Sequence, residues 1–512
     1  MKLLDCTLRD GGYYTNWDFD RSTVDTYLRA FDTLPVDYLE VGYRSIGLEG
    51  YLGEYFYCPI YVLERIRAAS SKKLVIILNE KDIRPHHVAE LLKPCLGLID
   101  MVRLAVDPQN FERALALGQA VKQLGFELCF NVMYMSSWGD YPELMDNLHR
   151  LEGLADYLYM VDSYGGVFPE DVVAAIQSIR ERTSIPLGFH GHDNLEMALA
   201  NTLTAVAQGV ELIDATVTGM GRGAGNLKME LLLVALNARQ GLEVDFNQLS
   251  QVVADFEQLQ SAHGWGASLP YMISGANSLP QKQVMEWVTK RFYSFNSIVR
   301  ALQNQKEKRV DNFKFAEFSA DKQYDTVVII GGGPSAVQHA EAVRHYLEGQ
   351  DSVAIIHASS KNAYEYHDLS TDQYFCLVGN EGHRMEKVFT EKLTDFRGSC
   401  ILPPFPRKMG TYIPAALADH TFELADVTFT DQLRDSHTVL ALQTAIALGA
   451  NHIFLVGYDG YTGRNITQLE RGLAEENDLL FRDFMTHTGK RLTSLSPTEY
   501  KVLDFQSVYA NL

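Results

Sequence analysis

The sequence predicts two α/β domains, the first of which is a closed (β/α)8 barrel. Over residues 1–245, short apolar runs alternate with amphipathic stretches whose apolar residues recur at three- and four-residue spacing. Strand–helix alternation predicts parallel strands joined by right-handed crossovers. Eight such units in a segment of this length are typical of a closed barrel. An open doubly wound sheet is the competing topology.

The eight expected strands are short runs rich in β-branched and aromatic residues. Helices are expected between them, for example at Phe111–Leu124, Glu170–Arg182 and Leu195–Gln208. The expected strands are Lys2–Leu8, Asp37–Tyr43, Lys73–Asn79, Ile99–Ala105, Phe126–Tyr134, Tyr157–Val161, Pro186–His190 and Glu211–Val217.

The pattern changes after the barrel. Residues 246–305 contain no strand-like run, and Gln248–Ala262 and Gln281–Arg300 have helical spacing, so a helical appendix packed on the barrel is expected. The polar, charged stretch 306–322 is interpreted as a linker. A second, Rossmann-like α/β domain is expected over 323–512. It opens with a buried strand, a glycine turn and a helix, and further elements are expected at Val353–His357, Gln373–Val378, Val439–Leu448 and His452–Val456.

Composition narrows the classes of partner. The 512 residues are 46% hydrophobic and 21% charged, which is typical of a globular protein, and the formal net charge is −20. An acidic chain is unsuited to nucleic acid, because binding phosphates requires a basic face. No apolar leader or long uncharged run is found, so a cytoplasmic protein without a membrane segment is expected. The six scattered cysteines favour reduced thiols, and Cys6 is expected to pack in its strand rather than take part in chemistry.

Three motifs follow the first, seventh and eighth expected strands. TLRDGG (7–12) places Arg9 and Asp10 at the carboxyl end of the first. HGHDN (190–194) ends the seventh, and since residues i and i+2 of an extended segment point the same way, His190 and His192 can present two imidazoles to one metal. GMGRGAGN (219–226) follows the eighth, and its glycines free backbone N–H groups for an anion.

Each motif alone has an ordinary explanation as a turn or a strand end, but their order along the barrel favours a single site. The first, seventh and eighth strands become neighbours when a barrel closes, and barrel enzymes place their chemistry at the carboxyl ends of the strands. One carboxylate and two imidazoles around an open cation leave positions for a bidentate substrate. Such a mixed nitrogen and oxygen site suits Mn²⁺, Mg²⁺, Co²⁺ or Fe²⁺.

Together with EVGYRS (40–45), VRLAVD (102–107) and VDSYGG (161–166), these motifs resemble the DRE-TIM metallolyase superfamily, which is HMG-CoA lyase-like. The resemblance covers about residues 1–300. It is greatest to the 4-hydroxy-2-oxovalerate aldolase branch, which also has a helical segment after the barrel, as at WGASLPYMISGA (265–276) here.

The resemblance implies a carbon–carbon lyase that uses a divalent metal. Asp10, His190 and His192 match the metal ligands, and Asn226 matches an asparagine at or near the metal. Arg9 matches the arginine that stabilises the enolate oxygen. The implied reaction makes or breaks a C–C bond through a metal-bound enolate of a 2-oxo acid such as pyruvate, with an aldehyde as second substrate. Mn²⁺ is the expected metal, with Mg²⁺ or Co²⁺ as alternatives.

The sequence departs from this branch at one catalytic position. The residue three places after the metal aspartate is a histidine base in the aldolases, but it is Tyr13 here. A phenol, with an ordinary pKa of about 10, is a poor base at neutral pH. Tyr13 is therefore expected either to donate a hydrogen bond or to line the pocket. Tyr271 loosely matches a tyrosine that acts as the acid, and an interfacial core role is the alternative.

Further pocket residues are expected at the strand ends and in the glycine loop. Arg103 and Asn131 stand near the ends of the fourth and fifth strands, and ordinary loop roles are the alternative. Gly221 and Gly223 are the loop residues expected to approach the substrate.

The second domain opens on VVIIGGGPSA (327–336), a glycine turn between a strand and a helix. With TAIALGANHIFLVGYDGY (444–461), it weakly resembles Rossmann-like domains of sialyltransferase-like and surface-glycan-associated proteins. The resemblance implies a nucleotide or sugar nucleotide, and a tight turn without a ligand is the alternative. NAD is not expected, because His357 occupies the end of the next strand, where an acidic residue would be needed. The expected phosphate-turn residues are Gly331, Gly333, Pro334 and Ser335, with Asn362 or Asp459 nearby.

The main hypothesis is thus an aldolase fused to a nucleotide- or glycan-precursor-binding domain, suited to unusual-sugar or surface-glycan biosynthesis. A Claisen-type acyl-CoA condensing synthase on the same barrel is the alternative. Gly12 argues against it, because those synthases have a glutamate at that position. A third reading makes the second domain a glycosyltransferase or binding module with the barrel as a scaffold. Formation of a homo-oligomer is left open.

Overall fold

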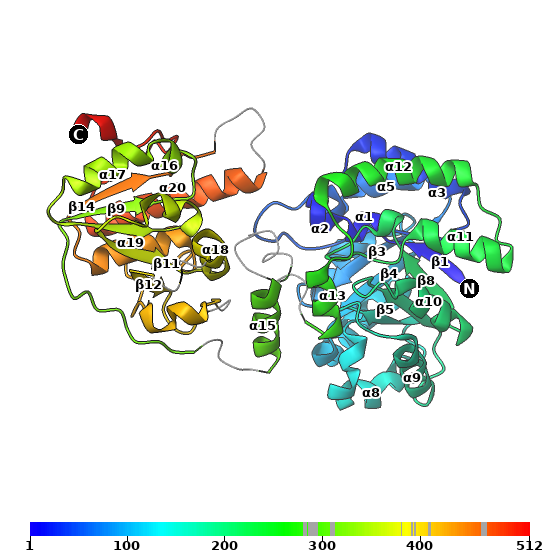
Figure 1. Ribbon diagram of the computed structural model, residues 1–512. Coiled ribbons are helices and arrows are strands. Elements are labelled where there is room, and N and C mark those ends of the chain that lie inside the picture. The colour runs from blue at the N-terminus through cyan, green and yellow to red at the C-terminus, as the bar shows by residue number, and fades with distance from the viewer. Residues whose placement is uncertain are drawn as a thin grey trace. The chain divides into compact units, whose positions relative to one another are not determined.

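The computed structural model describes residues 1–279, 284, 295–307, 313–379, 381–390, 393, 396–407, 411–461 and 468–512. The chain divides into two compact units, Met1–Met285 and Glu286–Leu512 (Figure 1). Most of the helix expected over Gln281–Arg300 lies outside the described residues, as does part of the expected linker, 308–312. The domain limits drawn from the sequence stay predictions.

Unit 1 is a closed barrel of eight parallel strands, which confirms the expected fold class. Each strand pairs with the next in chain order, and β1 closes the ring on β8, with Lys2 opposite Leu212. The carboxyl ends of β7, β8 and β1 therefore lie side by side. The strands are β1 (Lys2–Asp5), β2 (Tyr38–Tyr43), β3 (Lys73–Asn79), β4 (Met101–Val106), β5 (Glu127–Val132), β6 (Tyr157–Asp162), β7 (Leu187–Gly191) and β8 (Leu212–Ala215).

The first strand is shorter than predicted. It ends at Asp5 instead of Leu8, and the TLRDGG motif continues as two single-turn helices, α1 (Thr7–Asp10) and α2 (Gly12–Thr15). The cause is local, because the Asp5 carboxylate accepts hydrogen bonds from the Thr7 backbone N–H at 2.9 Å and the Thr7 hydroxyl at 3.0 Å. A side chain bonded to the backbone two residues ahead turns the chain out of the strand.

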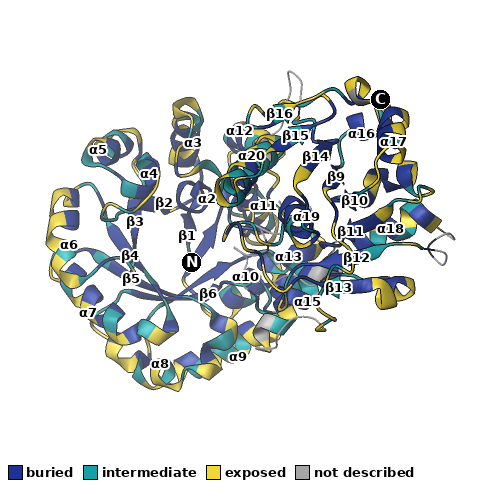
Figure 2. Cartoon of the chain, turned by 90° about the vertical axis from the view of Figure 1, so that its left-hand side faces the viewer, coloured by how far each residue is buried: buried dark blue, intermediate teal, exposed yellow. Residues whose placement is uncertain are grey.

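Helices surround the barrel, and Figure 2 shows buried strands inside helices whose outer faces are exposed. The helices expected at 111–124, 170–182 and 195–208 are confirmed as α7, α9 and α10. The helices after α2 begin and end as follows: α3 (Arg21–Thr33), α4 (Glu54–Tyr57), α5 (Ile60–Ala69), α6 (Pro85–Leu92), α7 (Phe111–Lys122), α8 (Pro142–Asn147), α9 (Pro169–Arg180), α10 (Ala198–Ala207), α11 (Met229–Gln240), α12 (Phe246–His263) and α13 (Leu269–Ala276).

The inside of the barrel is filled. Leu4, Val75, Met101 and Leu212 belong to one buried apolar cluster inside the ring of strands. At the amino end of β1, Lys2 Nζ donates to the Tyr157 hydroxyl at 2.8 Å. A packed interior leaves the carboxyl ends of the strands as the place for a cavity.

Unit 2 is built on an eight-stranded sheet in which the strand pairs are parallel. Its order is β13-β12-β11-β10-β9-β14-β15-β16, so that the first strand, β9, lies in the middle between β10 and β14. Four strands match the expected ones, and four short strands were not foreseen. The strands are β9 (Thr326–Ile330), β10 (Val353–His357), β11 (Asp372–Cys376), β12 (Ser399–Leu402), β13 (Thr421–Glu423), β14 (His452–Val456), β15 (Leu492–Ser494) and β16 (Asp504–Phe505).

Both faces of this sheet are covered, as in doubly wound folds. One apolar cluster joins the sheet to α19 and α20, and a separate cluster joins it to α17. Among the described residues, no helix combines the length and apolar character needed to cross a membrane. The helices are α15 (Phe295–Lys306), α16 (Ser335–Gln338), α17 (Ala340–Glu348), α18 (Glu381–Phe389), α19 (His437–Ala447) and α20 (Gln468–Thr488).

Candidate active site

A cavity of about 260 Å³ opens at the carboxyl ends of the barrel strands. It brings together residues from all three motifs, which are far apart in the sequence. The residues that line it include Arg9, Asp10, Tyr13, Asn131, His190, His192 and Arg222.

Four of the predicted metal residues converge in the wall of the barrel. His190 Nε2 lies 3.6 Å from Asp10 Oδ2, and the rings of His190 and His192 are 4.9 Å apart between centroids. Asn226 joins them, since its amide nitrogen donates to Asp10 Oδ2 at 2.7 Å. His192 and Asn226 also face each other across an isolated antiparallel bridge. The sequence spacing thus placed the two imidazoles on one side, as expected for extended backbone.

The second nitrogen of each imidazole is already bonded. His190 Nδ1 lies 2.8 Å from Asp214 Oδ2, and His192 Nδ1 lies 2.7 Å from the Asp162 carbonyl oxygen. Because a carbonyl only accepts, His192 carries its proton on Nδ1, and its Nε2 keeps a lone pair for a metal. Burial, followed by the neighbouring His190, lowers the pKa of His192 to about 3, so this imidazole is neutral.

The donor set fits a divalent cation. Metal binding needs neutral imidazoles and an ionised carboxylate. Burial raises the pKa of Asp10, but Arg9, the two histidines and the hydrogen bond from Asn226 together lower it below its usual value. Within the described residues, the buried Oδ1 of Asn226 has no hydrogen-bond partner. A buried, unpaired oxygen beside a carboxylate and two imidazoles is what a cation would satisfy.

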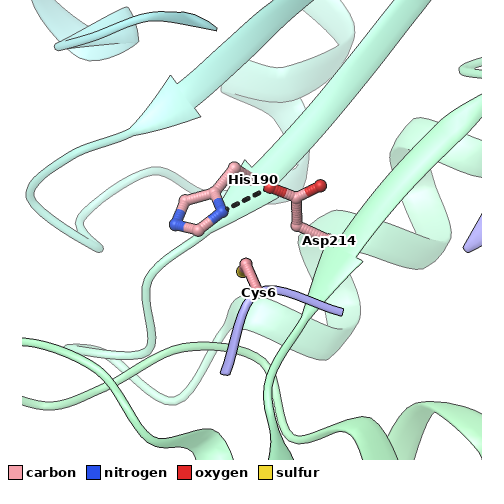
Figure 3. Close-up of side chains that lie close together, drawn as sticks. All are labelled: Cys6, His190 and Asp214. Carbon is pink, nitrogen blue, oxygen red and sulfur yellow. Dashed lines mark hydrogen bonds and ion pairs between the residues drawn. The ribbon is translucent and has the colours of Figure 1, made fainter. Parts of the chain in front are cut away.

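A second grouping, Cys6, His190 and Asp214, is also close enough to hold an ion, and Figure 3 shows His190 turned toward Asp214 with Cys6 beside them. The Asp214 oxygens, however, are already occupied. Oδ2 accepts from Arg103 at 2.7 Å as well as meeting His190, and Oδ1 accepts from Tyr159 at 2.7 Å. Burial also raises the pKa of the Cys6 thiol, which disfavours the thiolate that binds metals. This group supports His190 rather than forming a metal site of its own.

Arg9 is held at the cavity by two carboxylates. Its Nε donates to Glu40 Oε2 at 2.7 Å, and its Nη1 contacts Asp10. The following turn packs closely, because a Cβ on Gly12 would lie 2.1 Å from the Trp17 ring. Trp17 in turn donates its indole N–H to the Arg9 carbonyl oxygen at 2.9 Å. The guanidinium therefore has a fixed position at the cavity wall.

Arg103 lies beneath the cavity rather than in its wall. Its side chain is completely buried, and its guanidinium bonds Glu40, Asp214 and Asn131 at 3.3, 2.7 and 2.9 Å. The substrate contact predicted for Arg103 has no counterpart in this geometry, because its donors serve the residues that hold Arg9 and His190. Asn131 does line the cavity, as expected.

The glycine loop contributes a residue that the sequence reasoning missed. Arg222 lines the cavity, and its guanidinium carbon lies 5.4 Å from the centre of the Tyr13 ring. Its Nε is buried and has no hydrogen-bond partner among the described residues. The predicted residues Gly221 and Gly223 are structural here. A Cβ on Gly221 would lie 2.7 Å from Asn226 Nδ2, and the Gly223 carbonyl accepts from Tyr14. In the sequence, Arg222 could have been found as the arginine in GMGRGAGN (219–226), a motif that otherwise consists mostly of small residues.

The two predicted catalytic tyrosines occupy different places. Tyr13 lines the cavity, is 38% exposed, and its hydroxyl lies 3.4 Å from that of Tyr43. Tyr271 is not among the described lining residues. Burial raises its pKa to about 12, and its hydroxyl is bonded to Tyr14 instead.

In unit 2, a cavity of about 660 Å³ is lined by Gly331, Gly333 and Pro334, three of the four predicted turn residues. The fourth, Ser335, is buried, with its backbone N–H 3.0 Å from Asp459 Oδ2 and its hydroxyl also on that carboxylate. Asn362 donates to the carbonyl oxygens of Gly331 and Gly333, so its side chain stabilises the backbone of the turn.

Comparison with known proteins agrees with the barrel site. The model of the family described as HMGL-like matches residues 105–262, which include His190, His192 and Asn226. A 4-hydroxy-2-oxovalerate aldolase of Geobacillus genomosp. 3 is 30% identical over 261 residues, which are 48% of this chain and 72% of that enzyme. The chain belongs to the HMGL-like family. It is a metal-dependent aldolase or lyase, that is, a carbon–carbon lyase.

Other similar proteins agree with this membership of the HMGL-like family. The 4-hydroxy-2-oxovalerate aldolase of Bacillus thuringiensis strain Al Hakam is 29% identical over 259 residues, covering 48% of this chain and 72% of that enzyme. The N-terminal domain of a proposed aldolase from Bacteroides vulgatus, known from its crystal structure, is 53% identical in sequence to this chain, and the two structures superpose with a TM-score of 0.57. It covers 59% of this chain and 100% of that domain.

Proposed function

We propose that this HMGL-like protein makes or breaks the carbon–carbon bond next to the carbonyl group of a 2-oxo acid such as pyruvate, with an aldehyde as the second substrate. The observation that carries the proposal is the arrangement of Asp10, His190 and His192. Each imidazole has its Nδ1 bonded to a protein oxygen, both rings line the cavity, and His190 Nε2 lies 3.6 Å from the buried Asp10 Oδ2. The names of the aldolase relatives support the choice of substrates.

Asp10, His190 and His192, with Asn226 beside them, are the residues that would hold the cation. Mn²⁺ suits a mixed set of imidazole and carboxylate donors, and Mg²⁺ or Co²⁺ are alternatives. When bound, it acts as a Lewis acid that polarises the oxygens of the 2-oxo acid.

The protein supplies a fixed positive group for the charge that develops as the bond breaks. Arg9 is held by Glu40, which Arg103 also contacts, so its guanidinium does not need to reorganise. Preorganised donors of this kind stabilise an oxyanion in the transition state. In this scheme Arg103 is a positioning residue. Tyr13 and Tyr43, whose hydroxyls lie 3.4 Å apart, line the same cavity as Arg9.

Arg222 indicates that the aldehyde carries an anionic group. A bound cation would take the carboxylate of the 2-oxo acid, and Arg9 would face the developing oxyanion. Arg222 is a further cation in the cavity wall, and its buried Nε has no partner in the part of the chain that the structure describes. A carboxylate or phosphate on the aldehyde would satisfy it with a charge-assisted hydrogen bond.

The test follows exchange of the pyruvate methyl protons with deuterium from solvent by NMR. With Mn²⁺ present, the protein should catalyse exchange, and a chelator should stop it. Release of free CoA from an acyl-CoA, without exchange into pyruvate, would favour the condensing synthase instead. Absence of both reactions with a panel of 2-oxo acids would contradict the proposal.

A role in unusual-sugar or surface-glycan biosynthesis, in the cytoplasm, is a further part of this proposal. It is supported by the resemblance of the second half of the chain to glycan-associated domains. A screen of sugar-derived aldehydes with pyruvate tests it, and activity confined to simple aliphatic aldehydes would count against it.

A further inference from the structure

The cavity of unit 2 stands where doubly wound sheets bind ligands. Its residues follow the carboxyl ends of β9, β10 and β14. β9 lies between the other two, so the winding of the chain reverses there. Ligands of open parallel sheets bind at this reversal. At about 660 Å³, the cavity is of a size that holds a small molecule.

The helix N-terminus at this reversal is already occupied by a protein carboxylate. Asp459 accepts from the backbone N–H and the hydroxyl of Ser335, at the start of α16. A Cβ on Gly333 would lie 2.8 Å from the same carboxylate. An anionic ligand group is therefore excluded from the place that the sequence pattern predicted for phosphate, and it must bind elsewhere in the cavity.

Two cationic side chains stand on another side of the cavity. Lys361 Nζ donates to the Gly332 carbonyl oxygen at 3.0 Å, and Arg384 Nη1 donates to the Ser359 hydroxyl at 3.0 Å. Ser359 links them, because its hydroxyl also accepts from the Lys361 backbone N–H at 3.3 Å. An ammonium has three donors and a guanidinium five, so both groups retain donors for a ligand.

The acid next to these cations, Glu381, has its negative charge balanced by neighbouring protein groups. Glu381 is 2% exposed, and its Oε2 accepts from Ser360 N–H at 2.8 Å and from the Ser360 hydroxyl at 2.6 Å. Its Oε1 meets Arg384 at 2.6 Å and His437 Nε2 at 3.4 Å. Burial opposes its ionisation, but the neighbouring His437 and Arg384 and the hydrogen bonds from Ser360 lower its pKa to about 2. Glu381 thus fixes Arg384 at the cavity rather than offering a free negative charge.

We propose that this cavity binds a phosphorylated small molecule whose phosphate lies between Lys361 and Arg384, above Gly332. A Cβ placed on Gly332 would meet Ser359 Oγ at 3.7 Å and Lys361 Cδ at 4.0 Å, which are ordinary van der Waals contacts, so a group fits over this backbone without a clash. Tyr461, which is 42% exposed and lines the cavity, offers an aromatic face for the remainder of the ligand.

The test uses the full chain with His192→Ala, which removes the barrel metal site as a competing phosphate binder. Inorganic phosphate, pyrophosphate, the nucleoside 5′-monophosphates and hexose phosphates are titrated by calorimetry. At least one organic phosphate should bind one to one, and more tightly than inorganic phosphate. Lys361→Ala and Arg384→Ala should each weaken it about tenfold or more, since each removes a charge-assisted hydrogen bond.

Lys501→Ala is the matched control, because Lys501 is exposed and is not among the cavity residues. It should leave binding unchanged. Lys361→Arg, which keeps the charge, should retain most of the affinity even if Arg384→Ala proves unstable. Failure of every phosphate to bind, or equal binding by Lys361→Ala and the parent chain, would overturn the proposal. Neither result depends on aldolase activity.

Discussion

Both cavities of this protein lie at the carboxyl ends of parallel strands, but they differ in whether the buried polar groups named here have hydrogen-bond partners within the protein. In unit 1, the buried Arg222 Nε in the cavity wall and the buried Asn226 Oδ1 beside Asp10 have no hydrogen-bond partner among the described residues. In unit 2, the carboxylates of Glu381 and Asp459 are bonded by neighbouring protein groups. An unpaired buried polar atom costs free energy unless a ligand satisfies it. The barrel cavity is therefore arranged around its ligands, whereas these two carboxylates of unit 2 are satisfied by the protein itself, and the ligand proposed there binds through partly exposed cations.

The largest effect is expected from the metal ligands. Replacing Asp10 or His192 by Ala removes one of the proposed metal ligands, so bound Mn²⁺ and pyruvate exchange should both fall below detection. Metal content and NMR exchange measure this. His149→Ala, at an exposed histidine, is the control and should behave like the parent protein. Full exchange activity in His192→Ala would contradict the proposal that His192 is a metal ligand.

A smaller loss is expected from the residue that orients His190. Asp214→Asn replaces the carboxylate at Nδ1, and such outer partners typically change metal affinity by about 10- to 100-fold. Cys6→Ser, in contrast, should leave Mn²⁺ affinity unchanged. Titration of the apoprotein with Mn²⁺ compares the two variants. A large loss in Cys6→Ser would mean that the thiol is a ligand after all.

The next effect distinguishes binding of the aldehyde from binding of the 2-oxo acid. Arg222→Ala should lower kcat/KM for an aldehyde with a terminal carboxylate by about tenfold or more, since a charge-assisted hydrogen bond is lost. The value for a neutral aldehyde of the same length should stay the same, and so should pyruvate exchange. Initial rates with the matched pair of aldehydes measure this. An equal fall for both aldehydes would assign Arg222 to general positioning.

The smallest effect concerns the turn in unit 2. Asp459→Ala removes the cap on Ser335, which should lower the free energy of unfolding of unit 2 by about 1–2 kcal/mol. Denaturant unfolding followed by fluorescence measures it, and pyruvate exchange should be unaffected. A variant as stable as the parent would show that Asp459 has no structural role and is available to a ligand.

Much of the barrel could be predicted because its signals are local. Strand–helix periodicity located all eight strands, and the two-residue spacing of His190 and His192 placed their rings together. The supporting contacts could not be predicted, because they join distant segments. Asp214 reaches Arg103 across 111 residues, and Arg9 reaches Glu40 across 31.

The same distinction between local signals and contacts of distant segments explains which parts of unit 2 could be predicted. Its central strands were found because they are continuous apolar runs. The outer strands β12, β13, β15 and β16 have only two to four residues each, too few for a periodic signal. The sequence predicts Asp459 near the phosphate turn, and the structure confirms this. The sequence does not predict that the Asp459 carboxylate fills the turn by bonding Ser335, 124 residues away.

Anomalous scattering from a crystal soaked with Mn²⁺ tests the central claim most directly. The metal should lie within bonding distance of Asp10 Oδ2, His190 Nε2 and His192 Nε2, at about 2.0–2.3 Å from each. A metal bonded to Cys6 Sγ or Asp214, or no metal between the two histidines at saturating Mn²⁺, would contradict it.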